Sequence, residues 1–596
     1  MRENQNNSRE QGMEKYFFRA SAVDFKKVPG SPISYWISKS FRDCFSMGKP
    51  LSYLAAPRKG MVTADNPRFI RFWAEVDRSK IGFDLESREA AKNKNRKWFP
   101  YMKGGTFRRW SGNSEYVVNW ENDGFELLHM QEEGYKVGST NHNLEFIFKP
   151  AITWTKITSS DSGFRSNGFG YLYDDASGLC PTHAEDDHYA VLGLLNSPVT
   201  MHVLRSLNPT LNLNPGNLAD IPVISIRTSN AAVRCENFSK SDWSNYEISW
   251  EFSCLPLLHP DHRQPTLQAS YQSLRTHWRD MTLEMQRLEE ENNRIFIDAY
   301  GLQDELTPEV PLREITLTCN PHYRYGGDKT EEELEALLLA DTMRELVSYA
   351  VGCMLGRYSL DKPGLILANQ GETLADYLAQ VPQPSFAADD DNVIPMMNAY
   401  GDSRDDDWFA DDITLRFRQF LRLAFGEAHY EDNLAFIEQA LNIKNKRNYS
   451  LRDYFLGEFY ADHVRRYKKR PIYWLFSSPK GSFNALVYMH RYRPDTVSVV
   501  LKYLRDYREK LSTERERQLA ASINPATSQG DKTRAIKEAD RLAKVLTELD
   551  DYERDTLYPL ATEQLQIDLD DGVKVNYLKF GAALKKIVGL DAKGED

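Results

Sequence analysis

The chain of 596 residues lacks the patterns that mark several large classes of protein. Its six cysteines include no Cys-x-x-Cys pair, which argues against a disulfide framework and against a cysteine-rich zinc site. No apolar run reaches about 18 residues, and the polar N-terminal residues lack the apolar core of a signal peptide. We therefore expect a cytoplasmic protein that does not enter a membrane.

Catalytic signatures are equally scarce. The sequence has no GxGxxG, no GxxxxGK[ST], no HExxH and no Gly-x-Ser-x-Gly. It also contains no Pro-Pro dipeptide, and so no Asn-Pro-Pro-Tyr tetrad of the kind with which amino-methyltransferases hold the amine of a flipped base. We predict no catalytic residues, no metal ligands and no cofactor for this chain.

Charge is unevenly distributed along the sequence. The net charge is −11, so any contact with nucleic acid must lie on a locally basic face. Residues 25–230 hold 25 Lys and Arg against 21 Asp and Glu, a net charge of +4, which leaves −15 for the rest of the chain. The basic surplus therefore lies in the N-terminal part.

The pattern of short segments in that part indicates an α+β fold. Aromatic and β-branched runs such as 116–120 and 152–157 alternate with Gly, Asn and Ser turns, which is typical of a strand-rich module. The later sequence is mostly helical. We predict a flexible tail or linker at 1–24, a strand-rich domain at 25–230, a helical or mixed spacer at 231–400, a helical domain at 401–495 and a C-terminal helical hairpin at 496–596.

The helical hairpin is predicted from two apolar seams. One runs through Val500, Leu504, Tyr507 and Leu511 at spacings of three and four, and residues 535–549 carry a second seam. The polar segment 522–531 between them reads as a loop, so the helices should be antiparallel neighbours. A longer seam over 274–295 predicts a further helix.

The densest basic and aromatic segment is 88–110. Eight Lys and Arg face a single acid, Glu89, and five aromatic residues are interleaved with them. Cations neutralise phosphates, and arginine can pair with guanine in the major groove. A solvated helix end followed by an ordinary strand would give the same composition.

Upstream, 57–71 combines basic residues with Gly60, whose turn could expose N–H groups to a phosphate or be a plain loop.

Three further clusters have weaker signals. His183, Asp186 and His188 could hold a metal in a nuclease, but a capping box of Thr182 and Glu185 at a helix start explains the acids better. The acidic triplets 389–391 and 405–407 read as solvated loops without calcium spacing. The basic run 465–470 reads as a helix C-terminus or as a contact for nucleic-acid backbone.

Several motifs carry a resemblance to a known family. They are Phe25 to Trp36, Lys97 to Gly105, Tyr116 to Gly124, Leu192 to Ser197 with Leu207 to Asn212, Asn293 to Leu306, Ser348 to Tyr358 and Lys469 to Asn484. Together they resemble the C-terminal half of the PglX adenine-specific DNA methyltransferases of BREX phage-defence systems, from about residue 25 to nearly the end.

The resemblance implies a part of an enzyme. Complete members carry an S-adenosylmethionine-binding catalytic domain with the Asn-Pro-Pro-Tyr tetrad ahead of this region. We therefore expect S-adenosylmethionine to serve the missing domain, and this chain to be inactive alone. Residues 25 to about 227 resemble the target-recognition domains of restriction-modification enzymes, which read DNA through loops in the major groove.

On this basis we predict DNA sequence recognition for adenine methylation in phage defence. The partners would be double-stranded DNA, the methyltransferase catalytic domain and other proteins of the BREX system. The residues predicted to contact DNA are Arg58, Lys59, Asn66, Arg68, Arg71, Lys97, Arg108 and Arg109. The alternative is a scaffold of the defence complex that binds proteins and does not read DNA itself.

Overall fold

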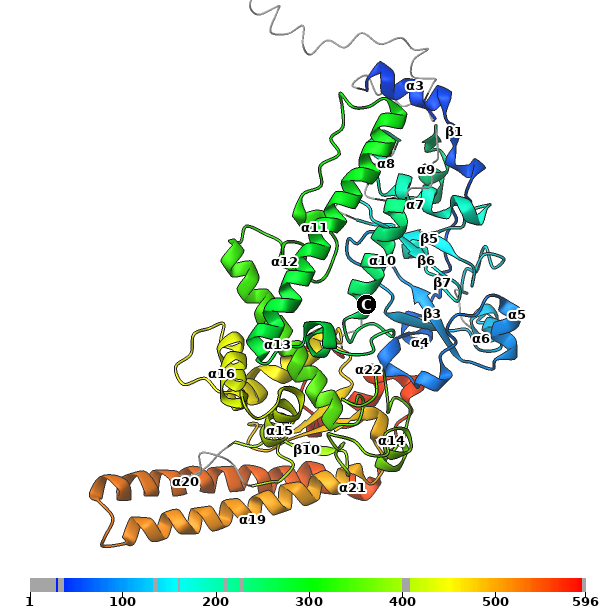
Figure 1. The fold of residues 1–596 in the computed structure, drawn as a ribbon. Helices are drawn as coiled ribbons and strands as arrows, with labels where there is room; N and C mark the ends of the chain where they lie inside the picture. Colours follow the sequence, from blue (N-terminus) through cyan, green and yellow to red (C-terminus); the bar gives the residue numbers. More distant parts are fainter. Residues whose placement is uncertain are drawn as a thin grey trace, which may run out of the picture. The chain divides into compact units, whose positions relative to one another are not determined.

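The computed structural model describes residues 28–29, 37–131, 138–158, 161–207, 210, 212–224, 230–398 and 408–591. The chain forms two compact units (Figure 1). Unit 1 comprises Met1–Phe69, Gly82–Trp243 and Arg279–Gly326. Unit 2 comprises Ile70–Ile81, Ser244–Trp278 and Gly327–Asp596. Each unit is therefore assembled from segments that are distant in the sequence.

Unit 1 contains the short strands. Strand β3 (Trp98–Met102) pairs antiparallel with β4 (Tyr116–Asn119) and parallel with β7 (Leu172–Tyr173). A second sheet has β5 (Ala151–Trp154) between β6 (Phe164–Asn167) and β8 (Leu179–Cys180). Strands β1 (Lys49–Pro50) and β9 (Pro222–Val223) form a separate pair. The inner residues are large, and Trp98, Trp120 and Trp154 are at most 1% exposed, so aromatic burial supplies much of this core.

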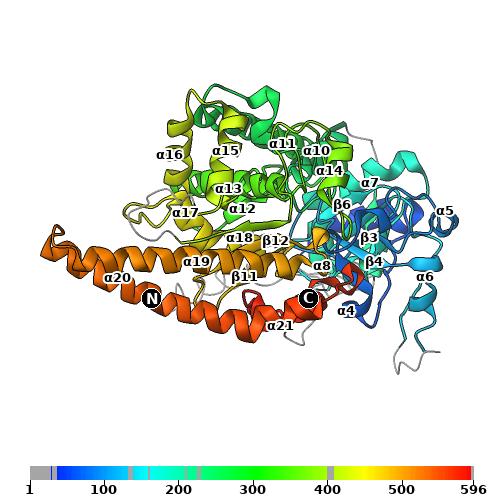
Figure 2. The same ribbon diagram turned by 90° about the horizontal axis from the view of Figure 1, so that it is seen from below.

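Helices surround the strands of unit 1. Two of them, α5 (Arg88–Asn93) and α6 (Glu121–Leu128), lie side by side next to β3 and β4, and α4 (Asn66–Phe69) follows the segment from Arg58 to Thr63 (Figure 2). The others are α3 (Lys39–Met47), α7 (His188–Leu195), α8 (Pro198–Leu207), α9 (Pro215–Ala219), α10 (Asn230–Ser244), α12 (Pro321–Tyr325) and the C-terminal part of α11 (Leu267–Tyr300).

Unit 2 has one small sheet inside a helical body. Strand β12 (Asn484–Tyr488) lies between β10 (Val393–Pro395) and β11 (Tyr473–Ser477), and both pairings are antiparallel. Strand β2 (Ile70–Phe72) also belongs to this unit. Its helices include α13 (Glu331–Met354), α14 (Leu374–Gln380), α15 (Ile413–Phe425), α16 (Tyr430–Leu441), α17 (Leu451–Tyr454), α18 (Tyr460–Arg466), α21 (Tyr558–Glu563) and α22 (Gly572–Leu578).

The longest helical pair of unit 2 is the predicted hairpin. Helices α19 (Thr496–Ile523) and α20 (Gln529–Tyr552) run side by side in both views (Figures 1 and 2). The seam residues Val500, Leu504 and Tyr507 are fully buried, so the predicted apolar faces meet. The α+β class with a long terminal hairpin is therefore confirmed.

Some expectations lie outside the described residues. These are the tail 1–24, most of the motif from Phe25 to Trp36 and the acidic triplet 405–407. The domain boundaries predicted from the sequence remain predictions. In the part of the chain that the structure describes, no helix has both the length and the apolarity needed to cross a membrane.

Candidate nucleic-acid interface

The most accessible of the predicted site residues are Arg58 and Lys59, which lie on an irregular segment along both sheets of unit 1. Arg58 exchanges backbone hydrogen bonds of 2.7 and 3.0 Å with Leu179, while both basic side chains are exposed. Gly60 follows at a point where a Cβ would lie 2.3 Å from the carbonyl oxygen of Tyr173. Gly60 is therefore required for close backbone packing, and nothing in its geometry indicates a phosphate-holding turn.

A loop from residue 138 to 148 supports this segment from the side. Asn143 Nδ2 donates a hydrogen bond of 3.0 Å to the carbonyl oxygen of Lys59, and the Arg58 guanidinium lies 5.7 Å from the centroid of the Phe146 ring. Thr140 and Val62 exchange backbone hydrogen bonds of 2.9 Å. The backbone below the two exposed cations is thus fixed, which lowers the entropic cost of binding a ligand there.

Asn66 and Arg68 lie on α4, and both already have protein partners. Thr63 Oγ1 donates to Asn66 Oδ1 at 2.5 Å, which occupies the amide oxygen that a bidentate contact with adenine would use. Arg68 Nε donates to Glu126 Oε1 at 2.6 Å, and Asn119 Nδ2 donates to the other oxygen of Glu126 at 3.0 Å. A contact of either residue with DNA would require an exchange of these partners.

The basic residues after α5 remain on the surface. Lys92, Lys94 and Arg96 are exposed, whereas Lys97 is half-buried with Nζ 5.6 Å from the ring centroid of Trp98. Helix α5 itself is fastened to α6 because Arg88 binds Asp123 with two hydrogen bonds, of 2.9 and 2.6 Å. Hydrogen bonding to Asp123 raises the pKa of Arg88, so the Arg88 charge is already paired within the protein.

An exposed aromatic pair on α6 was not anticipated from the sequence. Phe125 is 58% exposed and stacks on His129, with ring centroids 4.2 Å apart. Three residues just before Phe125, namely Asn122, Asp123 and Gly124, have left-handed φ angles of 51°, 61° and 73°. The Asn-Asp-Gly tripeptide is the signal that could have indicated this bend, because these residue types tolerate positive φ.

Arg108 and Arg109 are buried inside unit 1. Arg109 is 7% exposed, and its guanidinium pairs with Glu289 at 2.7 Å and with Glu314 at 3.3 Å. Burial alone would lower the pKa of Arg109, but the two carboxylates outweigh it and raise the pKa. Arg108 is 3% exposed, pairs with Asp242 at 3.4 Å and lies 5.0 Å from the Trp243 ring centroid. In this conformation neither guanidinium is presented to a ligand.

Arg71 belongs to unit 2, unlike the other seven predicted residues. Its Nε donates a hydrogen bond of 3.0 Å to the carbonyl oxygen of Asp570, and burial lowers its pKa. The structure therefore brings together Arg58 and Lys59, places Asn66 and Arg68 on the next helix of the same unit, and assigns Arg71 to the other unit.

The helix predicted to follow residues 182–187 is present as α7, but the capping box predicted for Thr182 and Glu185 is wrong. Helix α7 begins at His188 after a 3₁₀ turn at Glu185–Asp187, and Ala184 precedes that turn without a side-chain cap, so Thr182 forms no capping box with Glu185. His183 is exposed and contacts the Ser52 carbonyl, whereas His188 is buried with Nε2 2.8 Å from Ser166 Oγ. These residues do not form a metal-binding group in the described structure.

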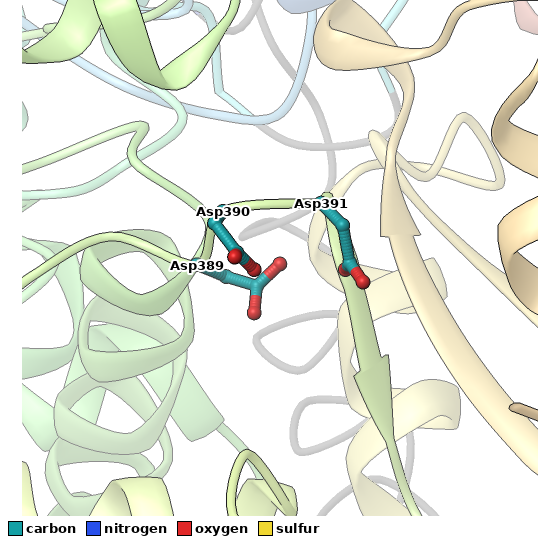
Figure 3. A group of neighbouring side chains, drawn as sticks. All are labelled: Asp389, Asp390 and Asp391. Carbon is teal, nitrogen blue, oxygen red and sulfur yellow. The ribbon is translucent and has the colours of Figure 1, made fainter.

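The acidic triplet of unit 2 is the solvated loop that we expected only in part, because Asp390 is exposed but Asp391 is half-buried and Asp389 is buried. Asp389 is 6% exposed, and carboxylate oxygens of Asp389, Asp390 and Asp391 lie within 4.8 Å of one another (Figure 3). Burial, followed by the charge of Asp391, raises the pKa of Asp389. Arg491 donates hydrogen bonds to the carbonyl oxygens of Asp389 and Asp390, so a buried arginine and protonation both offset the acidic charge.

No family model matches the chain. Over nearly its whole length it is similar to adenine-specific methyltransferases, which confirms the resemblance seen in its motifs.

Two relatives define the similarity. The adenine-specific methyltransferase BrxX of Escherichia coli O9:H4 (strain HS) is 36% identical over 586 residues, which are 95% of this chain and 46% of that protein. The adenine-specific methyltransferase PglX of Lacticaseibacillus casei (strain Zhang) is 33% identical over 592 residues, 96% of this chain and 46% of that protein. The chain thus spans about half the length of the curated relatives that it matches.

Proposed function

We propose that this chain is the DNA sequence-recognition portion of a site-specific adenine methyltransferase that acts in BREX phage defence. The observation that carries the proposal is the similarity of 95% of the chain to adenine-specific methyltransferases. The absence of a Pro-Pro dipeptide supports a division of labour, in which the chemistry belongs to a separate catalytic domain that binds S-adenosylmethionine. The complete enzyme would methylate adenine in cytoplasmic double-stranded DNA.

The exposed cations of unit 1 support contact with DNA. Arg58 and Lys59 lie on a fixed backbone, and Lys92, Lys94 and Arg96 add charge on the segment that includes α5. Lysine ammonium groups suit phosphate, whereas Arg58 has the planar donor group that reads guanine. Phe125 and His129 offer an exposed stacked pair that could contact bases or sugars. Arg108 and Arg109 would act indirectly in this account, by holding the segment that follows β3.

The experiment compares duplex DNA binding by the intact chain and by R58E/K59E. Both residues are exposed, so the variant should fold, and we expect the dissociation constant to rise at least about tenfold. The matched control is K537E/K544E. It changes the net charge by the same amount as R58E/K59E, but at two exposed lysines of α20 in unit 2. Equal loss in both variants would show non-specific attraction and contradict the proposal.

Methyl transfer gives a second readout. We expect no labelled methyl group to pass from S-adenosylmethionine to DNA when the chain is alone, because it has no amine-holding tetrad. Incorporation of label by the pure chain would refute the proposed division of labour.

A scaffold role is favoured by a different observation. Near the end of the hairpin, Leu519, Ile523 and Ile536 are 41%, 80% and 48% exposed, and exposed apolar side chains that gather in one place are typical of protein contacts. If L519D/I523D removes partners from a pull-down while R58E/K59E leaves DNA retention unchanged, the scaffold is the better account.

A further inference from the structure

Unit 2 contains a pocket of about 930 Å³ that none of the observations above explains. Its wall is formed by the π-helical turn Phe455–Phe459, by α18, by the turn between β11 and β12, and by residues 585–588. We call it the lysine pocket, because its lining includes Lys468, Lys469, Lys480, Lys585 and Lys586, together with Arg465. The volume lies within the usual range for small-molecule sites.

The charge of the lysine pocket is of one sign. Six cations line it and no Asp or Glu does, although acids outnumber bases by 11 in the whole chain. Arg465 pairs with Asp462 at 2.8 Å. Within the part of the chain that the structure describes, Lys469, Lys480, Lys585 and Lys586 form no ion pair. Such a concentration of like charge is relieved by an anion.

The floor of the pocket is apolar. Phe455, Leu475 and Ile587 line it and are at most 7% exposed, while Val588 at the same site is 83% exposed. A ligand that fits this lining therefore needs an apolar, preferably flat, part as well as several negative charges. A bare inorganic ion would contact only the cationic side chains and would leave the apolar lining uncovered.

The backbone that carries the lysines is held in place from below. The turn between β11 and β12 is bound to Glu548 of α20, which accepts hydrogen bonds of 2.7 Å from the Lys480 N–H and 2.6 Å from Ser482 Oγ. On the other side, the Lys585 N–H donates to the Leu475 carbonyl at 2.8 Å. The Lys480 and Lys585 ammonium groups therefore extend from fixed backbone.

Backbone conformation also fixes the two lysines that follow α18. Lys468 and Lys469 have left-handed φ angles of 50° and 62°, a conformation that costs free energy for any residue with a Cβ. The adjoining turn Phe455–Phe459 is a π-helix, which also occurs preferentially at functional sites. The same two residues close the C-terminus of α18, where the Lys468 N–H donates to the Arg465 carbonyl at 3.1 Å and the Lys469 N–H to the Val464 carbonyl at 2.8 Å.

We propose that the lysine pocket binds a nucleotide, with its base on the apolar floor and its phosphates on the lysine rim. Five of the six cations are lysines, which act as point charges toward phosphate, whereas recognition of peptide carboxylates favours the arginine fork. A paired duplex presents its bases stacked and covered. The nucleotide is therefore either free in solution, as a nucleoside polyphosphate, or unpaired within a single DNA strand. This inference does not depend on DNA recognition by unit 1.

The test is a titration of the full chain with a fluorescent ATP analogue, followed by competition with unlabelled ATP and with a short single-stranded oligonucleotide. We expect binding below about 1 mM, and K469E/K585E should weaken it at least about tenfold. K537E/K544E on α20, which makes the same charge change outside the pocket, should leave the affinity within about twofold. Displacement by ATP alone indicates a free nucleotide, and displacement by the oligonucleotide indicates a single strand.

A second variant blocks the pocket without changing its charge. A Cβ added to Gly457 would have no atom within 4 Å, so G457W should fold and fill the space with its ring. We expect G457W to abolish binding, whereas attraction by surface charge alone would survive it. Binding that persists in G457W or in K469E/K585E would overturn the proposal. So would an absence of binding at about 1 mM, or equal displacement by duplex DNA or by a polyglutamate peptide.

Discussion

The arginine side chains of unit 1 show how one residue type serves two purposes. Arg109 is enclosed by Glu289 and Glu314, and Trp110 Nε1 also donates to Glu289 at 2.7 Å, so two side chains depend on the buried Glu289 carboxylate. Arg58 is exposed, and its guanidinium donates a hydrogen bond of 3.2 Å to the Pro57 carbonyl oxygen and lies beside the Phe146 ring, with no carboxylate of the described residues paired to it. Arg109 is therefore a part of the core, whereas Arg58 is available to a ligand.

Removal of the buried arginine should therefore be costly. We expect R109A to lower the free energy of unfolding by about 3–5 kcal/mol, because Glu289 would keep a buried charge without its partner. The control R58A should change it by less than about 0.5 kcal/mol. Chemical denaturation followed by tryptophan fluorescence measures both, and similar values for the two variants would contradict the assignment.

Buried histidine makes unit 2 sensitive to acid. His490 is 1% exposed, its Nε2 lies 3.2 Å from the Val76 carbonyl oxygen, and burial followed by the nearby Arg357 charge lowers its pKa to about 3. Below pH 6.5, the usual pKa of histidine, His490 becomes protonated in the unfolded chain but stays neutral in the folded chain. Stability from this residue is thus complete above pH 6.5 and is lost as the pH falls toward 3.

A substitution isolates this contribution. H490Q keeps a donor for Val76 but does not titrate. Between pH 7 and pH 5.5 the wild type should lose about 1 kcal/mol more than H490Q, as measured by denaturation at each pH. Parallel pH profiles of the two proteins would show that His490 is not the cause.

Lys469, with its left-handed backbone, links stability with binding. K469G should raise the melting temperature, since glycine adopts a φ of 62° without the cost of about 1 kcal/mol that a side chain carries there, and it should weaken nucleotide binding. K480G removes a charge at a residue without positive φ and should weaken binding with no gain in stability. A decrease in melting temperature for K469G would contradict the idea of strain retained for function.

Single-residue roles were the least predictable from sequence. The run 88–110 shows its cations, but their partners Asp242, Glu289 and Glu314 come from segments more than 130 residues away, so burial of Arg108 and Arg109 could not be foreseen. The exposed pair Arg58 and Lys59 was found because neighbouring charges repel and usually remain at the surface. Lys480 and Lys585 were missed since no local pattern joins them.

Among the secondary-structure elements, the hairpin is the most regular. Leu504 of α19 is fully buried at the contact of the two helices. L504A should destabilise the hairpin by about 2–5 kcal/mol through lost burial and the cavity left behind, whereas L519A, at a residue 41% exposed, should have little effect. Hydrogen exchange of α19 and α20 amides would report the difference, and equal protection in both variants would contradict the packing described.

Helices were predicted well where an apolar period runs over several turns, as in α11, α19 and α20. Helix caps were predicted less well: Thr182 and Glu185 have the spacing of a capping box, yet a 3₁₀ turn at Glu185–Asp187 precedes α7 and this box does not form. In the acidic triplet 389–391, the burial of Asp389 was missed because the hydrogen bonds from Arg491 to this loop are tertiary contacts.

For the whole molecule, the uneven distribution of charge along the sequence limits where DNA can bind. The surplus of +4 in residues 25–230 lies within a chain of net charge −11, so binding of DNA must be local and sensitive to salt. The exposed cations of unit 1 would hold the backbone, and recognition of bases would follow from side chains such as Arg58. The lysine pocket of unit 2 adds a separate anion site.

The most direct test of DNA recognition is the salt dependence of duplex affinity. A plot of the logarithm of the association constant against the logarithm of salt concentration should be steep for the wild type. Its slope should fall by about 1 in R58E/K59E, since the lost phosphate contact of Lys59 contributes about 0.9 and Arg58 is assigned to a base. An unchanged slope in that variant, with the wild-type affinity retained, would contradict the claim that this face of unit 1 holds DNA.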